Sequence, residues 1–285
     1  MTLIIDGKKL AEQIRAELKT EVKELAARYG RSPGLAVVQV GEDPASTIYV
    51  NNKIKACKEA GIESFGHILK KDISEAYLLN LITELNADPL VDGILCQLPL
   101  PSQIDEGKVT FAINPEKDVD GFHPVNVGLL SLGKRALVAC TPLGILEMLK
   151  ASGIELEGKN AVVLGRSNIV GKPVAQLLLK ENCTVTITHS RTRDLPKICS
   201  RADILVVAIG RANFVTPDFV NPGQVIIDVG INRTEEGKVV GDVDFQAVEP
   251  IVRAISPVPG GVGPMTIAML LKNTVTSYNR RMGAQ

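Results

Sequence analysis

The sequence predicts an α/β protein with two domains, in which mostly parallel strands alternate with covering helices. The chain has 285 residues, which is long for one hydrophobic core and comfortable for two. Short apolar runs alternate with amphipathic stretches in both halves, as expected of βαβ units. The 25 glycines and 16 prolines suit the many tight connections of a soluble α/β fold.

The N-terminal half alternates between helical and strand-like patterns. Apolar residues at helical spacing predict a helix from Leu10 to Leu25. Two more helices are expected, one that contains Tyr49 and stops at Gly61, and one that runs from the N-cap residue Ser74 to Leu85. Strands are expected over residues 35–40, 62–69 and 91–96, and the first and last of these should be buried. Gln97 should then lie at the carboxyl end of a parallel strand, where open α/β sheets bind ligands.

The C-terminal half repeats this alternation after an interruption. Residues 99–138 are rich in proline, glycine and charge, which suggests an irregular active-site or interdomain segment. Thr141-Pro142 has N-cap and first-turn chemistry and predicts a helix over 142–152. Strands are expected over 161–164, 184–188, 204–209 and 225–229, helices over 170–181 and 194–200, and a last helix from Pro264 onward.

These patterns predict two domains with a cleft between them. The first domain should comprise residues 1–140, completed by the last helix over 264–285. The second should comprise residues 141–263 and resemble a Rossmann-type unit.

Charge and cysteine content narrow the class of protein. Lys+Arg and Asp+Glu both number 32, so the net charge is zero, which argues against nucleic acid as a partner. The N-terminus lacks a signal-peptide pattern and the longest apolar run, 204–209, is too short to cross a membrane. The five cysteines show no CxxC or metal-ligand spacing, which favours buried thiols in a reducing compartment. We therefore expect a cytoplasmic protein without a membrane partner.

Tyr49 and Lys53 form the most informative pair of residues. They are four positions apart, so on a helix they share a face with Cβ atoms about 5–6 Å apart. A phenol beside an amine is a candidate acid/base pair. Ordinary amphipathic helices also carry a solvated lysine beside a half-buried tyrosine, so the pair alone leaves both interpretations open.

Residues 161–173 read as a strand, a glycine-bearing turn and the start of a helix, which is typical of nucleotide binding. Gly165 allows a tight turn, Gly171 allows close packing of the helix, and the exposed amides could receive a pyrophosphate. The pattern departs from GxGxxG, because Ser167 replaces the second glycine and Gly171 comes one place late. A packing glycine in any βα unit is the alternative interpretation.

The turn after the next expected strand indicates which cofactor is bound. NAD-specific sites carry an acidic residue near the ribose hydroxyls, whereas this turn offers Ser190 and Arg191. Arg166 projects from the preceding turn. Hydroxyl and guanidinium groups suit a 2′-phosphate, so the sequence favours NADP over NAD, with a basic surface loop as the alternative.

Six motifs in order resemble the bifunctional methylenetetrahydrofolate dehydrogenase/methenyltetrahydrofolate cyclohydrolase family over essentially the whole chain. They are Tyr49-x-x-x-Lys53, Gln97–Pro101, Lys117–His123, Gly165–Ser167 with Val170–Pro173, Asp228–Asn232 and Pro259–Thr266. Only the segment between Gly210 and Val225 carries little of the family's pattern. The resemblance implies oxidation of 5,10-methylenetetrahydrofolate by NADP, followed by hydrolysis of the methenyl cation to 10-formyltetrahydrofolate, in a homodimer joined through the cofactor domain.

The resemblance also implies roles for particular residues. Lys53 transfers protons, Tyr49 stacks on and positions the substrate, Gln97 holds the lysine, and Asp120 binds the pterin edge. The first domain is then the folate-binding catalytic domain and the second binds NADP. Expected cofactor contacts are Gly165, Arg166, Ser167, Ser190, Arg191 and Ile231. Further substrate contacts are Pro259, Gly260, Gly261 and Gly263, whose glycines suit close backbone approach to a ligand but also fit a simple helix entry.

The pair Asp118 and Asp120 suggests a metal site, but the spacing does not fit a calcium loop. We therefore expect no metal, and we expect His123 to be structural.

Three other functional interpretations are distinguishable. The chain could instead be an NADP-linked dehydrogenase of another small substrate without hydrolase activity, or a sensor that binds NADP without turnover. A third alternative is a family member that has lost or gained one activity.

Overall fold

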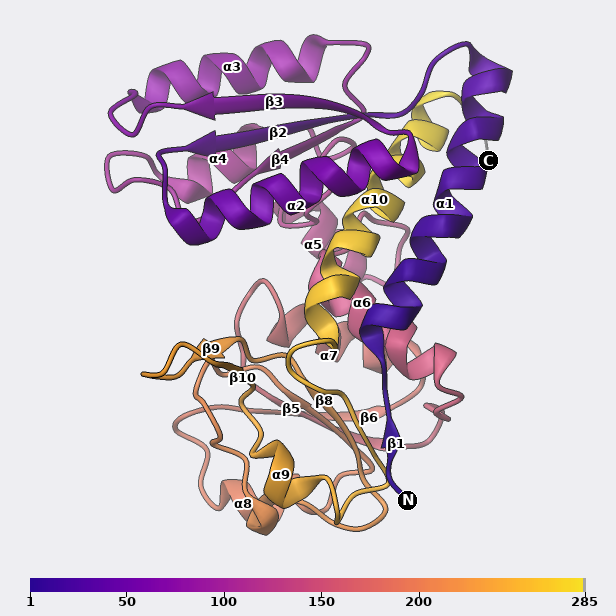
Figure 1. Ribbon diagram of the computed structural model, residues 1–285, viewed down its shortest axis with the longest axis vertical. Coiled ribbons are helices and arrows are strands. Elements are labelled where there is room, and N and C mark those ends of the chain that lie inside the picture. Colours follow the sequence, from indigo (N-terminus) through magenta and orange to yellow (C-terminus); the bar gives the residue numbers. More distant parts are fainter. Residues whose placement is uncertain (284–285) are drawn as a thin grey trace. The chain divides into compact units, whose positions relative to one another are not determined.

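A computed structural model describes residues 1–283, apart from the side chains of residues 44 and 45 (Figure 1). The chain divides into two compact units. One contains residues 13–140 and 267–285 and is built on a sheet of three strands; we call it the three-stranded unit. The other contains residues 1–12 and 141–266 and is built on a sheet of six strands; we call it the six-stranded unit. The predicted two-domain α/β class is confirmed.

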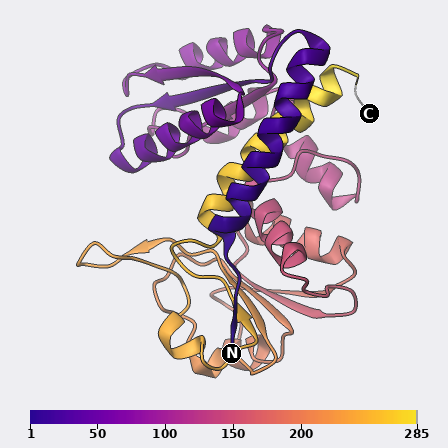
Figure 2. The same ribbon diagram turned by 45° about the vertical axis from the view of Figure 1, so that its right-hand side comes forward.

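The three-stranded unit has a parallel sheet in the order β3-β2-β4, with β2 (Gly34–Val40) in the centre between β3 (Glu63–Leu69) and β4 (Gly93–Cys96). Every residue of β2 is buried, which explains its continuous apolar sequence. Figures 1 and 2 show the sheet between α2 (Pro44–Ala60) and α3 (Glu75–Ala87). Alternate β2 residues pack with α3 in one hydrophobic core, namely Ala36, Val38 and Val40 with Leu78, Ile82 and Leu85.

Two helix ends of this unit lie where the sequence predicts them, the end of α2 at Gly61 and the start of α3 at Ser74, whereas the helix predicted from Leu10 to Leu25 is longer at both ends. The carboxylate of Asp43 accepts a hydrogen bond from the Ser46 amide at 2.8 Å and begins α2. Gly61 ends α2 in the left-handed conformation, with φ 78°. The Ser74 hydroxyl accepts from the Tyr77 amide at 3.2 Å and begins α3. These ends fix where α2, and with it Lys53, lies on the sheet.

The prediction that residues 99–138 are irregular is wrong in part, because two short helices form there. These are α4 (Glu106–Ala112) and α5 (Pro124–Ser131). The Asp105 carboxylate caps the start of α4, and the His123 imidazole caps α5 by accepting from the Val125 amide at 3.1 Å. The prolines and glycines of this segment act as helix starts and turns rather than as breakers of all structure.

The six-stranded unit has a parallel sheet in the order β1-β11-β8-β7-β5-β6. Its strands are β1 (Leu3–Ile4), β5 (Asn160–Leu164), β6 (Thr184–Thr188), β7 (Ile204–Val207), β8 (Val225–Asp228) and β11 (Ala254–Ile255). Its other elements are the helices α6 (Cys140–Ala151), α7 (Gly171–Lys180), α8 (Leu195–Cys199) and α9 (Phe245–Val248), the 3₁₀ turn Pro217–Phe219, and the hairpin β9 (Asn232–Arg233) and β10 (Val239–Val240). Because β6 and β7 lie on opposite sides of β5, the chain reverses its direction of progress across the sheet between β5 and β7, where doubly wound sheets bind ligands.

The chain's first and last segments do not follow the boundaries expected from the sequence. Residues 1–12 group with the six-stranded unit because Leu3 and Ile4 of β1 pair with Ala254 and Ile255 of β11. The last helix, α10 (Val262–Arg281), begins two residues before Pro264. Its residues from Ile267 onward group with the three-stranded unit, as does most of α1 (Gly7–Tyr29). Positions 284 and 285 of the predicted last helix lie outside the described residues.

The sequence analysis also led to expectations about the cysteines and about membrane-spanning helices. All five cysteines are free and buried, and burial raises the pKa of the Cys57 and Cys96 thiols to about 12. Within residues 1–283, no helix is long and apolar enough to cross a membrane.

Candidate functional site

Lys53 is held by a neutral amide at the end of β4. It lies on α2, one turn after Tyr49, and its Nζ donates to Oε1 of Gln97 at 2.9 Å. The Gln97 Nε2 donates to the Leu98 carbonyl at 2.7 Å, so the amide oxygen is turned toward the lysine. Lys53 is half-buried, whereas Tyr49 exposes 42% of its surface. The amine is therefore fixed by its partner, and the phenol ring is free to contact a ligand.

Asp120 supplies a carboxylate near this amine. It is half-buried, and burial raises its pKa to about 6 although the Lys53 charge acts in the opposite direction. The neighbouring carboxylate of Asp118 adds a smaller increase to the same pKa. A carboxylate of this kind is ionised at neutral pH and becomes protonated in mildly acidic solution.

The turn that carries Asp120 is built by Asp118. The Asp118 carboxylate accepts from the Phe122 and His123 amides at 3.2 and 2.8 Å, and from Nδ2 of Asn126 at 2.9 Å. Gly121 adopts φ 72°, and a Cβ there would overlap the backbone of 138–139. Asp118 is thus fully used in shaping the backbone, and His123 has the structural role expected from the sequence.

Two further elements hold this turn from outside. Asn273 of α10 donates through Nδ2 to the Val119 and Val138 carbonyls, both at 2.8 Å. The buried Lys117 donates through Nζ to the carbonyls of Leu85, Asn86 and Asp88 at the end of α3, at 3.0, 2.8 and 2.8 Å. The charge of Lys117 satisfies the free carbonyls of that helix end. Lys117, Asp118 and Gly121 therefore fix the backbone that carries Asp120.

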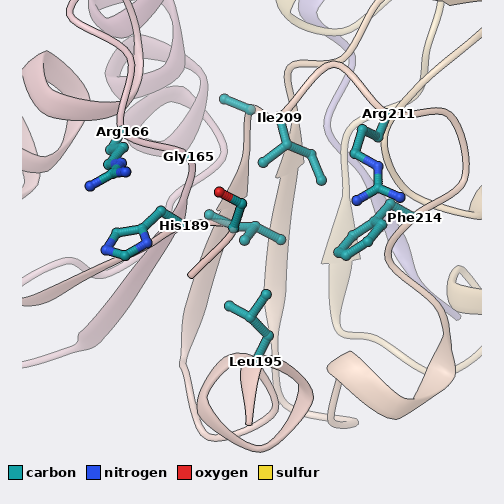
Figure 3. A pocket seen from close by; sticks show the side chains of 10 residues that line it. Gly165, Arg166, His189, Leu195, Ile209, Arg211 and Phe214 are labelled. Atoms are coloured by element: carbon teal, nitrogen blue, oxygen red, sulfur yellow. The ribbon is translucent and has the colours of Figure 1, made fainter. Parts of the chain in front are cut away.

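A pocket of about 270 Å³ opens at the carboxyl ends of β5, β6 and β7, at the reversal point of the six-stranded sheet (Figure 3). Its lining residues come from the last position of β5, from the loops that follow the three strands and from α8. They are Leu164, Gly165, Arg166, His189, Ser190, Leu195, Ala208, Ile209, Arg211 and Phe214. Figure 3 shows Arg166 and His189 on one side and Arg211 and Phe214 on the other.

The glycines of the first turn have the roles expected from the sequence. Gly165 adopts φ 129°, and a Cβ there would overlap the carbonyl of Ala208 in the β7 loop. A Cβ at Gly171 would overlap the carbonyl of Gly165, so this glycine lets α7 pack directly on the turn. Ser167 is exposed, and its hydroxyl accepts from the Val170 and Gly171 amides, both at 3.2 Å.

Of the six predicted cofactor residues, three line the pocket, and the other three, Ser167, Arg191 and Ile231, do not. Gly165, Arg166 and Ser190 line the pocket. Arg191 is exposed and is not among the lining residues; its amide donates to the imidazole of His189 at 3.2 Å.

Sequence reasoning missed His189, Arg211 and Phe214 as pocket residues. The Arg211 guanidinium lies 4.5 Å from the centroid of the Phe214 ring, within the range of a cation–π contact. The available signal was the position of Arg211 and Phe214 directly after the expected strand 204–209, at the sheet's reversal point.

Ile231 lies next to the first turn of α10. A Cβ at Gly263 would lie 3.8 Å from Cδ1 of Ile231, whose side chain is 52% exposed. Gly260 adopts φ 107°, and its carbonyl accepts from the Lys8 amide at 2.8 Å. A Cβ at Gly7 would overlap the Gly261 carbonyl, so part of this loop's glycine content serves packing against the start of α1. Pro259 is exposed.

No group of three or more His, Cys, Asp or Glu side chains in the described part of the chain is arranged to hold a metal ion. Asp118, the residue that raised this alternative, instead accepts from Phe122, His123 and Asn126.

The fold and these two groups of residues define a class of protein. A doubly wound sheet with a basic pocket at its reversal point is typical of dinucleotide binding, and an amine held beside a half-buried carboxylate is typical of proton transfer. The chain therefore has the features of a dinucleotide-dependent enzyme with a second α/β unit for its substrate.

Comparisons with known proteins identify the family. Residues 5–120 match the catalytic domain, and residues 139–282 the NAD(P)-binding domain, of tetrahydrofolate dehydrogenase/cyclohydrolase. The bifunctional protein FolD of Magnetococcus marinus is 58% identical over 98% of both chains. The crystal structure of the bifunctional enzyme FolD from Campylobacter jejuni superposes with a TM-score of 0.97, at 49% identity, over 99% of this chain and 100% of that one. The chain belongs to the tetrahydrofolate dehydrogenase/cyclohydrolase family, as the six motifs predicted.

A relative with a bound cofactor is also similar. The Trypanosoma brucei methylenetetrahydrofolate dehydrogenase-cyclohydrolase, solved in complex with NADP and an inhibitor, superposes with a TM-score of 0.94 at 39% identity, over 99% of this chain and 98% of that one.

Proposed function

We propose that this protein oxidises 5,10-methylenetetrahydrofolate to 5,10-methenyltetrahydrofolate with NADP and hydrolyses the product to 10-formyltetrahydrofolate, as a step of one-carbon metabolism. The observation that carries this proposal is the arrangement of Lys53, Gln97 and Asp120. An amine held at 2.9 Å by a neutral amide lies near a half-buried carboxylate in one unit. Family membership supports both activities.

The oxidation depends mainly on binding and orientation. When bound, NADP supplies the hydride acceptor. The pocket suits its adenosine phosphate end, because Arg166 and Ser190 can donate to a 2′-phosphate and Gly165 leaves room for close backbone approach. We assign Ser167, Arg191 and Ile231 to the same cofactor site, and Pro259, Gly260, Gly261 and Gly263 to substrate contact.

The hydrolysis depends on Lys53. Attack of water on the methenyl carbon forms a carbon–oxygen bond and releases a proton, which Lys53 accepts when its amine is unprotonated. The ring then opens by cleavage of a carbon–nitrogen bond, and the leaving nitrogen receives a proton from the same amine. Gln97 is neutral, so it orients the amine without adding a second negative charge beside the one that Asp120 supplies. Tyr49, one helical turn away and exposed, stacks on the substrate.

Asp120 fixes the orientation of the pterin. An ionised carboxylate accepts two hydrogen bonds from an amino-pyrimidinone edge, and its placement in a rigid turn sets the angle of the ring. Since the pKa of Asp120 is about 6, this acceptor is present at neutral pH.

We also propose that the protein acts as a cytoplasmic homodimer. Its five free, buried thiols suit a reducing compartment, and the family resemblance supports self-association through the cofactor domain. Light scattering after size exclusion tests the dimer, since a mass of one chain at micromolar concentration would contradict it.

One pair of assays tests the proposed function. Reduction of NADP with 5,10-methylenetetrahydrofolate measures the first reaction, and hydrolysis of methenyltetrahydrofolate without cofactor measures the second. We expect both activities. Dehydrogenase activity on another small substrate, with no hydrolysis above the spontaneous rate, would instead favour the NADP-linked dehydrogenase. Binding of NADP without any turnover would favour a sensor.

A further inference from the structure

One carboxylate in the six-stranded unit accepts hydrogen bonds from three consecutive backbone amides. Asp242 is fully buried. Its Oδ2 accepts from the Ile209 and Gly210 amides at 2.7 and 2.9 Å, and its Oδ1 accepts from the Arg211 amide at 2.8 Å. Oδ1 also accepts from Nδ2 of Asn232 at 2.9 Å. Four N–H groups therefore converge on this one side chain.

The turn that donates these bonds depends on the carboxylate. Gly210 lies in the left-handed conformation, with φ 64°, and successive amides in such a turn point into one concavity that favours an anion. These amides follow the end of β7, so the strand ladder no longer pairs them. Without an acceptor they would be partly buried and unpaired, which is costly in a protein interior.

The same turn forms one wall of the cofactor pocket. Ile209 and Arg211 both line it, and Arg211 places its guanidinium over the Phe214 ring (Figure 3). Arg166 lies on the opposite side. The position of Arg211, and therefore the distance between the two cationic sides of the pocket, follows from the conformation of residues 209–211.

The Asp242 carboxylate is itself held firmly. The Asp242 amide donates to Oδ1 of Asp228 at 2.9 Å, and its carbonyl accepts from the Val215 amide at 2.9 Å. A Cβ at Gly230 would overlap the Asp242 carboxylate, so the segment that precedes Ile231 packs directly against it. One side chain thus joins the pocket turn to the Gly230–Asn232 segment.

We propose that Asp242 is a positioning residue of the cofactor site, which fixes the Ile209–Arg211 wall by accepting its three amides. The proposal rests on the proposed function for the identity of the cofactor, NADP. Asp242 does not bind the cofactor directly. It acts through Arg211 and through the backbone of residues 209–211.

The test is the Asp242→Asn variant of the full-length protein. The substitution keeps the size of the side chain but replaces one acceptor oxygen with an NH₂ group that faces N–H donors. We expect a rise of at least tenfold in the NADP KM and in the NADP Kd from calorimetric titration. Cofactor-free hydrolysis of methenyltetrahydrofolate should stay within twofold of wild type, which a general loss of folding would not allow.

The matched control is Asp203→Asn. The Asp203 carboxylate also accepts a hydrogen bond from a backbone amide, that of Asn160 at 2.8 Å. This contact lies at the amino end of β5, whereas the pocket lies at the carboxyl ends of the strands. We expect its NADP KM and Kd to stay within twofold of wild type. If both variants weaken NADP equally, the effect is not specific to the pocket wall and the proposal fails.

A second variant covers the case in which Asp242→Asn does not fold. Gly210→Ala keeps the Asp242 carboxylate, and the added Cβ has open space around it. The alanine must nevertheless adopt the left-handed conformation of Gly210, which is unfavourable for a residue with a side chain. We expect a rise of about threefold to tenfold in the NADP Kd with hydrolysis retained. An unchanged NADP Kd in either folded variant would overturn the proposal. Titration does not require turnover, so a wild-type protein that lacks the dehydrogenase reaction would contradict the proposed function without affecting this test.

Discussion

The turn around Asp120 and the pocket around Gly165 position ligand-binding groups in different ways. At Asp120, side chains shape the backbone, since Asp118 and Asn273 together accept or donate five hydrogen bonds around residues 117–123 and 138. At the pocket, glycines shape the first turn and the Asp242 carboxylate holds the opposite wall, but the groups expected to meet the ligand, Arg166 and Ser190, are exposed side chains. The first site fixes a single carboxylate against one edge of the substrate, whereas binding of a large anionic cofactor is spread over several groups of the second. Single substitutions should therefore have larger effects at Lys53 and Asp120 than at the pocket.

The largest expected effect is that of Lys53→Met on hydrolysis. Removal of a general acid/base typically lowers the rate about 10²–10⁴-fold, and methionine preserves the length of the side chain. The measurement is the kcat of methenyltetrahydrofolate hydrolysis, with NADP binding as a check of folding. Lys55→Met is the matched control, because Lys55 lies on the same helix, is exposed and pairs with Glu59 at 3.9 Å. Hydrolysis within a few-fold of wild type in Lys53→Met would remove the lysine from the mechanism.

Asp120→Asn should weaken folate far more than NADP. A hydrogen bond to a charged group contributes about 1.5–3 kcal/mol, which corresponds to roughly tenfold to a hundredfold in the folate KM. Asp105→Asn is a suitable control, since asparagine also caps helices well and α4 should persist. Equal losses for folate and NADP would indicate that Asp120 only supports the turn.

The pH dependence of folate binding provides a sharper test of the same residue. Because the pKa of Asp120 is raised to about 6, the carboxylate is lost as the pH falls through 6, and the folate KM should rise between pH 7 and pH 5. In Asp120→Asn this rise should disappear, since the amide does not titrate. An identical pH profile in both proteins would assign the titration to another group.

Smaller effects are expected for the cofactor preference. Ser190→Ala and Arg166→Ala should each raise the NADP KM about tenfold, through loss of about 1.5 kcal/mol or more per charge-assisted hydrogen bond, with less change for NAD. Arg191→Ala should have a weaker effect, because Arg191 does not line the pocket. Arg193→Ala, an exposed arginine of the same turn, serves as the control. If wild type uses NAD and NADP equally well, the interpretation of this turn is wrong.

The smallest expected effect concerns the stability of the three-stranded unit rather than either site. Ser74→Ala removes the hydroxyl that caps α3 and should lower the free energy of unfolding by about 1 kcal/mol. Urea denaturation measures this loss, and the kinetic constants for folate and NADP should not change. A change in kcat would show that α3 influences the lysine site directly.

Much of the lysine site could be predicted because its determinants are local. Tyr49 and Lys53 share one helix, so their spacing pairs them, and Gln97 directly follows a buried strand, where ligands bind. The family resemblance then joined Gln97 to the lysine. The hydrogen bond between Lys53 and Gln97 has the geometry that the family resemblance implied.

The features that were missed depend on distant or very short segments. Strands β1 and β11 have two residues each, which is too short for any periodic pattern. Helices α4 and α5 begin at caps within a segment rich in proline and glycine. Asp242 accepts from amides about thirty residues earlier in the chain, so no local pattern marks its function.

The pairing of β1 with β11 has a consequence for the order of folding during synthesis. Leu3 leaves the ribosome long before its partner Ala254, about ten to fifty seconds earlier at typical rates of about 5–20 residues per second. During that interval the three strands of the other sheet, which all lie between residues 34 and 96, are complete. The nascent chain can therefore form the three-stranded sheet before the strand that pairs with β1 has been synthesised. An extension or truncation at the N-terminus should disturb the six-stranded sheet and leave the three-stranded sheet intact.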